Sequence, residues 1–295
     1  MSRLDRVVLG VLITFTLSAL AGYWAFALHP QWLPQDETAL QFYSISFRFF
    51  AQIQIFLAAL VLAVPLIRRG RAAWVAGFAG VFLVSFTSEF VGTGYGIPFG
   101  GYGYTALLGT KLGGRVPALI PVSWFLMALP SFVLANAAFA HRSKWVKLAM
   151  ASILLVIWDL ALDPAMSFLT PYWLWEETGP YYGMPWMNLL GWFVTGLALM
   201  GVLSVTGGRR WSEWVNVRFA LIYYAAVLLM PLGMVAAAGE WLAVFTTLAA
   251  LGLWGGTARL AGSSGAVRPH AVPDGRLDRA SDTGGAPLPS LRVGG

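Results

Sequence analysis

Two aspartates in the segment Trp158-Asp-Leu-Ala-Leu-Asp-Pro164 have the type and spacing that most clearly suggest chemistry in this sequence. They are four positions apart, so a helix would carry both carboxyl groups on one face, one turn apart. Two carboxylates this close in a region of low dielectric constant cannot both ionise cheaply. One of Asp159 and Asp163 should therefore hold its proton near neutral pH, which supplies one acid and one base. The alternative is that both merely accept hydrogen bonds and cap helices.

Two glutamates begin a pattern that occurs twice, Glu-x-x-Gly-x-x-Tyr-Gly-x-Pro, at 89–98 and at 176–185. One interpretation is a duplicated element that places Glu89 and Glu176 in related positions around one cavity. The other is convergence, because the chain holds 33 glycines and 16 prolines and turns reuse such residues. Both interpretations stay open, and both glutamates are candidate catalytic residues beside the aspartates.

Aromatic residues and one amide are the candidates for contact with a substrate. Rings beside glycines favour close packing around a flat apolar ligand, although a belt of Trp and Tyr at a membrane surface would have the same composition. Asn188 could cap a helix or orient a carboxylate or water. The candidates are Tyr95, Tyr102, Tyr104, Trp124, Trp158, Trp175, Tyr182, Asn188 and Trp192.

The composition indicates that these residues are positioned by helices in a membrane. Of the 295 residues, 58% are hydrophobic and 11% charged, whereas a soluble domain carries about 25% charged residues. Open strands are excluded in lipid because their backbone N–H and C=O groups would stay unpaired. A membrane barrel is excluded because the apolar runs do not alternate between apolar and polar residues. We therefore predict an all-α polytopic bundle with eight transmembrane helices, at roughly 7–28, 47–67, 72–91, 118–140, 146–163, 186–205, 217–237 and 240–256.

The first of these runs also resembles a signal peptide, because Ala19-Leu20-Ala21 is similar to a cleavage site. Cleavage there would leave seven helices. We expect the helix to be retained, because the run continues to Leu28 and the alternation of charge between loops needs it. The predicted organisation is one transmembrane domain over 1–256 and a disordered cytoplasmic tail over 257–295, rich in Gly, Pro, Ser and Arg.

The charges predict an orientation in the cell membrane. Basic residues fall in alternate connections, and 16 of the 19 lie on the side that holds both termini, which the positive-inside rule places in the cytoplasm. This distribution explains the basic character of the chain without nucleic acid. Eight of the 13 acids face the other side: Asp36, Glu37, Glu89, Asp159, Asp163, Glu176, Glu177 and Glu240.

The sequence offers little for metal or redox chemistry. It has no cysteine and three histidines, so thiolate metal sites and cysteine nucleophiles are excluded and few ligands remain for a histidine-bound metal. We expect neither a cofactor nor a metal.

Four segments resemble the CruF family of carotenoid 1′,2′-hydratases, and together they run through about 80–195. They are Gly-Ile-Pro-Phe-Gly-Gly-Tyr-Gly-Tyr (96–104), Val-Pro-Ala-Leu-Ile-Pro-Val-Ser-Trp (116–124), Trp-Asp-Leu-Ala-Leu-Asp-Pro (158–164) and Gly-Pro-Tyr-Tyr-Gly-Met-Pro-Trp-Met-Asn-Leu-Leu-Gly-Trp (179–192). The resemblance implies a multi-pass lyase that adds water to the terminal double bond of a linear carotenoid ψ-end, of the γ-carotene or lycopene type. The implied partners are the carotenoid, water, membrane lipid and other carotenoid-pathway enzymes.

Other classes of membrane protein remain as alternatives. A membrane prenyltransferase would need two Asp-rich motifs to hold Mg²⁺ and diphosphate, and only one is present. A lycopene-cyclase-like isoprenoid enzyme is a further alternative. In a proton-coupled transporter the acids would line a pathway with broken helices at the midplane, whereas here the acids and glycine-rich breaks lie near one face.

Overall fold

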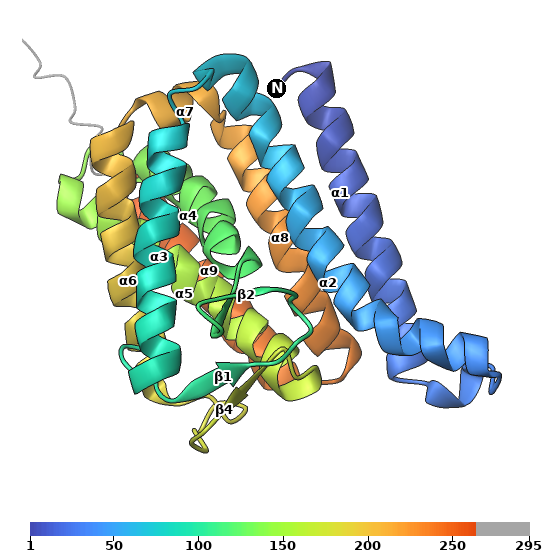
Figure 1. The fold of residues 1–295 in the computed structure, drawn as a ribbon. Coiled ribbons are helices and arrows are strands. Elements are labelled where there is room, and N and C mark those ends of the chain that lie inside the picture. The colour runs from blue at the N-terminus through green and yellow to red at the C-terminus, as the bar shows by residue number, and fades with distance from the viewer. Residues whose placement is uncertain (264–295) are drawn as a thin grey trace, which may run out of the picture. The chain divides into compact units, whose positions relative to one another are not determined.

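The computed structural model describes residues 1–263, which form a bundle of helices (Figure 1). Within this range, eight helical segments are long and apolar enough to cross a membrane, and the eight predicted spans are confirmed. A short helix, α7, links two of them. The bounds are α1 Arg3–Gly22, α2 Glu37–Pro65, α3 Val75–Tyr95, α4 Leu119–Ala138, α5 Lys144–Asp163, α6 Trp186–Thr206, α7 Arg210–Trp214, α8 Val217–Ala237 and α9 Trp241–Ser263.

Helix α4 is the central element of the bundle. Its membrane-spanning stretch is 78% buried, a larger share than in any other described span, and it packs against α2, α3, α5, α6 and α8. It is apolar on all sides, as expected for a helix surrounded by others. The remaining spans bury one face and expose apolar side chains on the other, which suits contact with lipid.

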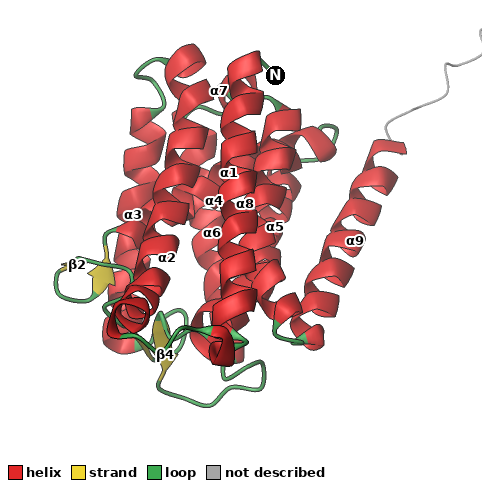
Figure 2. Ribbon diagram, turned by 90° about the vertical axis from the view of Figure 1, so that its right-hand side faces the viewer, coloured by secondary structure: helices red, strands yellow, loops and turns green. Residues whose placement is uncertain are grey.

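Short strands lie at the end of the bundle opposite the N-terminus (Figure 2). Strand β1 (Tyr102–Tyr104) pairs antiparallel with β4 (Trp173–Trp175), so that Tyr102 lies opposite Trp175. Strands β2 (Lys111–Leu112) and β3 (Val116–Pro117) form a second two-stranded sheet, which is a small hairpin. The β1–β4 pair fastens the loop after α3 to the loop after α5, two segments that are about 70 residues apart in the chain.

Helix α2 begins ten residues before the predicted boundary, at Glu37 rather than at 47. Asp36 is its N-cap, and the Asp36 carboxylate accepts a hydrogen bond from the Ala39 N–H at 2.9 Å. The prediction followed the apolar run and therefore missed a polar first part. Before α2, α1 continues through a π-helical turn, Tyr23–Ala27, and the chain forms one 3₁₀ turn, Pro30–Trp32.

The prediction that α5 ends at Asp163 is confirmed for its α-helical part, but the chain does not leave the helical path there. Asp163 has helical backbone angles, and the chain continues as a π-helical turn over Pro164–Leu169. Pro164 lacks an N–H for the carbonyl of Leu160, four residues earlier, but the Tyr181 hydroxyl donates to that oxygen at 2.7 Å. The Ser167 hydroxyl donates to the Asp163 carbonyl at 2.9 Å. Side chains thus replace the backbone donor, and the π-helical turn follows α5 directly at the proline.

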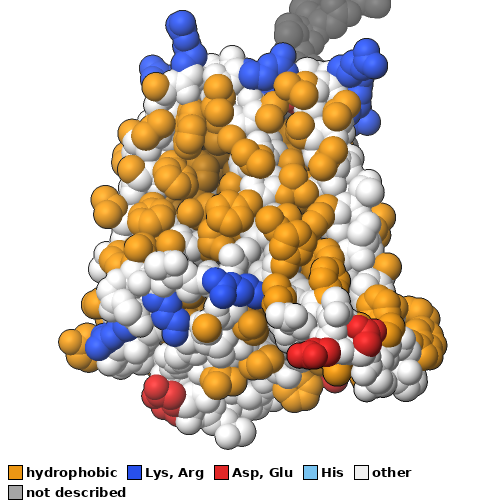
Figure 3. Space-filling model, turned by 45° about the vertical axis from the view of Figure 1, so that its right-hand side comes forward, with side chains coloured by type: hydrophobic (Ala, Val, Ile, Leu, Met, Phe, Trp, Pro, Cys, Tyr) orange, Lys and Arg blue, Asp and Glu red, His pale blue; other side chains and the backbone are white. Residues whose placement is uncertain are grey.

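Charge is unevenly distributed between the two ends of the bundle. On the face shown in Figure 3, Lys and Arg gather along the end that carries the N-terminus, and acidic side chains appear at the opposite end with a few basic ones. This agrees with the alternation of the loops, while the cytoplasmic placement of the termini stays a prediction. Helix α9 continues to Ser263, into the segment predicted as tail; the rest of that segment lies outside the described residues.

Candidate active site

Three buried carboxyl groups face one small cavity near the end opposite the N-terminus. The cavity has a volume of about 50 Å³ and lies between α3, α4, α5, α6 and the β1–β4 pair. Glu89 is 4% exposed, and Asp159 and Asp163 are each 1% exposed. The lining residues are Glu89, Phe99, Tyr102, Tyr104, Ile120, Ser123, Trp124, Trp158, Asp159, Leu162, Asp163, Trp173, Trp175, Asn188 and Trp192. No Lys, Arg or His is among them, so hydrogen-bond donors are the neutral groups of the wall.

Glu89 accepts hydrogen bonds from three side chains. The hydroxyls of Tyr102 and Tyr104, on β1, both donate to Oε2, the latter at 2.7 Å, and the Trp124 indole N–H on α4 donates to Oε1 at 2.8 Å. Burial raises the pKa of both tyrosine hydroxyls well above their usual range, and the charge of Glu89 raises it further. Both phenols therefore stay protonated and act as donors. The arrangement holds Glu89 as a fixed acceptor beside the cavity.

Asp159 and Asp163 lie on one face of α5, as their spacing predicts, and both line the cavity. Asp163 Oδ1 accepts hydrogen bonds from the indoles of Trp173 at 2.8 Å and Trp175 at 3.3 Å, both on β4. Asp159 Oδ2 accepts one from the Asn188 amide at 2.8 Å. The second oxygen of each aspartate has no partner among the described residues, and neither has the indole N–H of Trp158. Buried polar atoms are normally paired, so each of these three atoms is free to bond to a polar reactant.

Indole rings form much of the cavity wall. Trp124 and Trp192 stack with ring centroids 4.1 Å apart, and Trp158 meets Trp192 edge to face at 5.7 Å. On the other side, Tyr102 packs against Trp175 at 5.3 Å. The faces of such rings attract positive charge, so the cavity combines acidic groups with a surface that stabilises a cation.

A larger apolar groove lies next to the cavity and shares part of its wall. It has a volume of about 430 Å³, lies between the α1–α2 pair and the helices α4, α5 and α8, and is lined almost wholly by apolar side chains. The residues that line both spaces are Ile120, Ser123, Trp158, Leu162 and Trp173. Sequence reasoning missed this groove. A signal was present in the small residues Ala51 and Ala58 of α2, seven positions apart, which leave room on the side of that helix that faces the groove.

The structure brings together most of the predicted site residues but not all of them. Besides the three acids, the cavity is lined by Tyr102, Tyr104, Trp124, Trp158, Trp175, Asn188 and Trp192. Tyr95, at the end of α3, is 77% exposed and lies outside it. Tyr182 also lies outside; it packs against Phe168, and its hydroxyl accepts a hydrogen bond from the Ala243 N–H at 3.2 Å. Trp173 was missed, although its alternation with Trp175 puts both indoles on one face of a strand.

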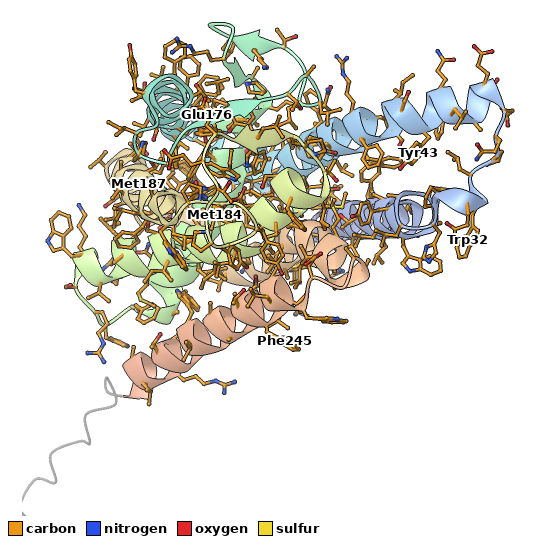
Figure 4. The ribbon with its side chains drawn as sticks, turned by 90° about the horizontal axis from the view of Figure 1, so that it is seen from below. Trp32, Tyr43, Glu176, Met184, Met187 and Phe245 are labelled. Carbon is orange, nitrogen blue, oxygen red and sulfur yellow. The ribbon has the colours of Figure 1, made fainter. Side chains whose placement is uncertain are left out.

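Glu176 is an exposed residue outside the cavity, just beyond β4. Figure 4 shows it among the loops at the end opposite the N-terminus, well away from Trp32 in the α1–α2 connection and from Tyr43 in the first part of α2. Its backbone N–H donates to the Gly101 carbonyl at 2.9 Å, whereas Glu89 lies within α3. The two copies of the repeated pattern thus have different backbones, and their glutamates do not occupy related positions. Only Gly96 and Gly183 correspond, with φ of 72° and 85°.

The described part of the chain holds no group of three or more His, Cys, Asp or Glu side chains arranged to bind a metal ion. Its fold and its cavity define a class: a multi-pass membrane protein that buries carboxyl groups where an apolar groove ends in an aromatic wall. Residues 50–253 match the family described as "Carotenoid biosynthesis protein", and the chain belongs to that family. The resemblance noted in the sequence is thereby confirmed at the level of the family.

The name of one relative agrees with the hydratase activity that the resemblance implies. The chain is 36% identical over 118 residues to a protein named bisanhydrobacterioruberin hydratase from Haloarcula japonica. The matched part covers 39% of this chain and 39% of the relative. No solved structure matches the chain.

Proposed function

We propose that the protein hydrates the terminal C1′=C2′ double bond of a carotenoid ψ-end, of the γ-carotene or lycopene type, to a tertiary 1′-hydroxy carotenoid. The observation that carries this proposal is the junction of a long apolar groove with a small cavity of three buried carboxyl groups. The family and the hydratase relative support the same chemistry. Hydration of an isolated alkene needs a proton donor held against the double bond, a site that tolerates a carbocation and a held water, and the cavity offers a group for each.

The groove suits a linear polyene. A ψ-end is slender and wholly apolar. Its transfer from the membrane into the protein is therefore favourable only where the walls of the groove pack closely against it. The groove extends from Ala58 and Val227, in the middle of their spans, to Leu33 and Ala39 near the surface. A C40 carotenoid is about as long as the ~30 Å hydrocarbon core. We place the terminal alkene at the junction and the remaining chain along the groove.

In the proposed mechanism, Asp159 is the acid and Asp163 the base. Asp163 accepts two indole hydrogen bonds and Asp159 only one from an amide, and hydrogen bonds of this kind favour the ionised form of the acceptor. The proton of Asp159 adds to C2′, and the π electrons of the double bond form the new C–H bond and leave a cation at C1′. Water adds to C1′ while Asp163 takes its proton. Transfer of that proton back to Asp159 restores the site, and the net change is addition of one water.

Stabilisation of the tertiary cation falls to the wall of the cavity. A desolvated cation over an indole face gains about 2 kcal/mol, and Trp124, Trp158 and Trp192 form one cluster of indoles in the wall of the cavity. Glu89, fixed by three donors, adds a negative charge that does not have to reorient. The water is expected at the unpaired oxygens of the aspartates and the N–H of Trp158.

Expression in cells that accumulate lycopene or γ-carotene tests the proposal. We expect a product heavier by one water, which mass spectrometry of the extracted pigments will detect, and ¹⁸O from labelled water in the new hydroxyl group. An unchanged mass with altered absorption would indicate cyclisation and would refute hydration. An unchanged pigment from cells that contain the folded protein in their membranes would also refute it.

Ser123→Phe should close the passage between groove and cavity. Ser123 lines both spaces and its hydroxyl donates to the Ile120 carbonyl at 2.8 Å. The matched control is Ser44→Phe, because the Ser44 hydroxyl makes the same kind of bond to the Gln41 carbonyl at 2.7 Å but lies on the exposed face of α2. We expect at least about a hundredfold loss of hydration from the misplaced alkene in Ser123→Phe and none in the control. Equal activity of the two variants would show that the substrate takes another path.

A further inference from the structure

A second groove lies at the end of the bundle that carries the N-terminus, between α1 and α8. It has a volume of about 290 Å³, and the two helices that form it pack against each other. Its apolar side consists of Met1, Leu9, Ile13 and Ile222. A Cβ atom placed on Gly10 would meet nothing within 4 Å, so the groove is open along α1. It therefore offers an apolar strip that faces the surroundings of the bundle.

Two arginines complete this groove, Arg6 from α1 and Arg218 from α8. Both are exposed, and within residues 1–263 neither guanidinium group has a hydrogen-bond or ion-pair partner. Asp5, which precedes Arg6 in the chain, is buried and already engaged, because it accepts from Arg69 at 2.8 Å and lies 3.9 Å from Arg68. Glu213, which precedes Arg218 by five residues, does not line the groove. Two uncompensated positive charges thus flank an apolar strip.

This combination matches the chemistry of a phospholipid rather than that of a free anion. Guanidinium groups bind phosphate through paired N–H donors, while an acyl chain fits an apolar strip between membrane helices. Arginines beside such a strip, near the end of two spans, are at the depth of lipid headgroups. A soluble phosphate would use the arginines but not Leu9, Ile13 or Ile222.

We propose that the groove between α1 and α8 is a binding site for an acidic phospholipid. Its phosphate lies between Arg6 and Arg218, and the first part of one acyl chain lies along the apolar strip past Gly10. This site is separate from the carboxyl cavity and does not depend on the reaction proposed there.

Native mass spectrometry of the full chain in detergent tests this site, with phosphatidylglycerol, phosphatidylcholine and inorganic phosphate as probes. We expect the first phosphatidylglycerol to bind about 30-fold more weakly to the Arg6→Gln/Arg218→Gln variant than to the unmodified protein. The matched control, Arg142→Gln/Arg210→Gln, removes the same charge from exposed positions at the same end and should bind normally. Gly10→Leu, which keeps both arginines and fills the strip, should also weaken binding.

Three results would overturn the proposal. Equal losses in the arginine variant and its control would show attraction to overall charge without a site. Competition by inorganic phosphate at the concentration of the lipid would show a free-anion site. Equal binding of phosphatidylcholine would show that the arginines do not select the headgroup.

Discussion

Asp159→Asn is expected to reduce hydration by about 10²–10⁴-fold, the usual contribution of a general acid, while the protein remains in the membrane. The amide keeps the size of the side chain and an oxygen for the Asn188 amide, which now donates to Asp159 Oδ2 at 2.8 Å. It cannot deliver a proton to an alkene carbon. Asp163→Asn should reduce the rate of hydration by a similar factor, because no base then takes the proton of the attacking water. Initial rates of product formation in membranes, normalised to the amount of folded protein, measure both effects.

The control for these variants is Asp36→Asn. Asp36 also lies near the end opposite the N-terminus, but it is exposed and caps α2, and asparagine is an equally good cap. We expect its activity to be unchanged. A double variant of Asp159 and Asp163 that retained activity within tenfold of the unmodified protein would remove the pair from the mechanism.

The spans and the aspartate pair were predictable because strong physical constraints act on them locally. A helix in lipid needs about 20 apolar residues, so eight runs in the sequence became eight helical segments. A spacing of four fixes two side chains on one helical face whatever surrounds them, and the structure places both carboxyl groups at one cavity. Boundaries were less predictable, because they depend on single distant contacts. The hydroxyl of Tyr181, 17 positions after Pro164, donates to the Leu160 carbonyl where α5 passes into the π-helical turn.

The environment of each acid was not predictable, because it is made by contacts between distant segments. The donors to Glu89 come from β1 and α4, and those to Asp163 from β4. Pairing of β1 with β4 involves three residues on each side, too few for a recognisable strand pattern. The apolar groove arises from the packing of α1 and α2 on the rest of the bundle. Such packing cannot be predicted from a local sequence pattern. The repeated Glu-x-x-Gly-x-x-Tyr-Gly-x-Pro pattern even suggested related positions for Glu89 and Glu176, which the backbone does not give them.

That repeated pattern supplies a matched pair of substitutions, Glu89→Gln and Glu176→Gln. Glu89→Gln replaces a carboxylate that accepts from two hydroxyls and one indole with an amide that has a single acceptor oxygen. The Trp124 N–H cannot turn into an acceptor, so the glutamine oxygen must face it at 2.8 Å and the amide N–H₂ must face the two phenols. The fixed negative charge is lost, and removal of one such electrostatic contact typically costs about 10²–10³-fold in rate. We expect a loss of that size in Glu89→Gln.

Glu176→Gln should leave the rate unchanged, because Glu176 is exposed and outside the cavity. The substrate concentration for half-maximal rate should change less than the maximal rate in Glu89→Gln, since the charge acts on the cation and not on the neutral alkene. Tyr104→Phe leaves two of the three donors and should cost less than Glu89→Gln in the same assay. If the two glutamate variants were impaired equally, the cavity would not be the reaction centre, and the acids at the surface of the loops would have to be reconsidered.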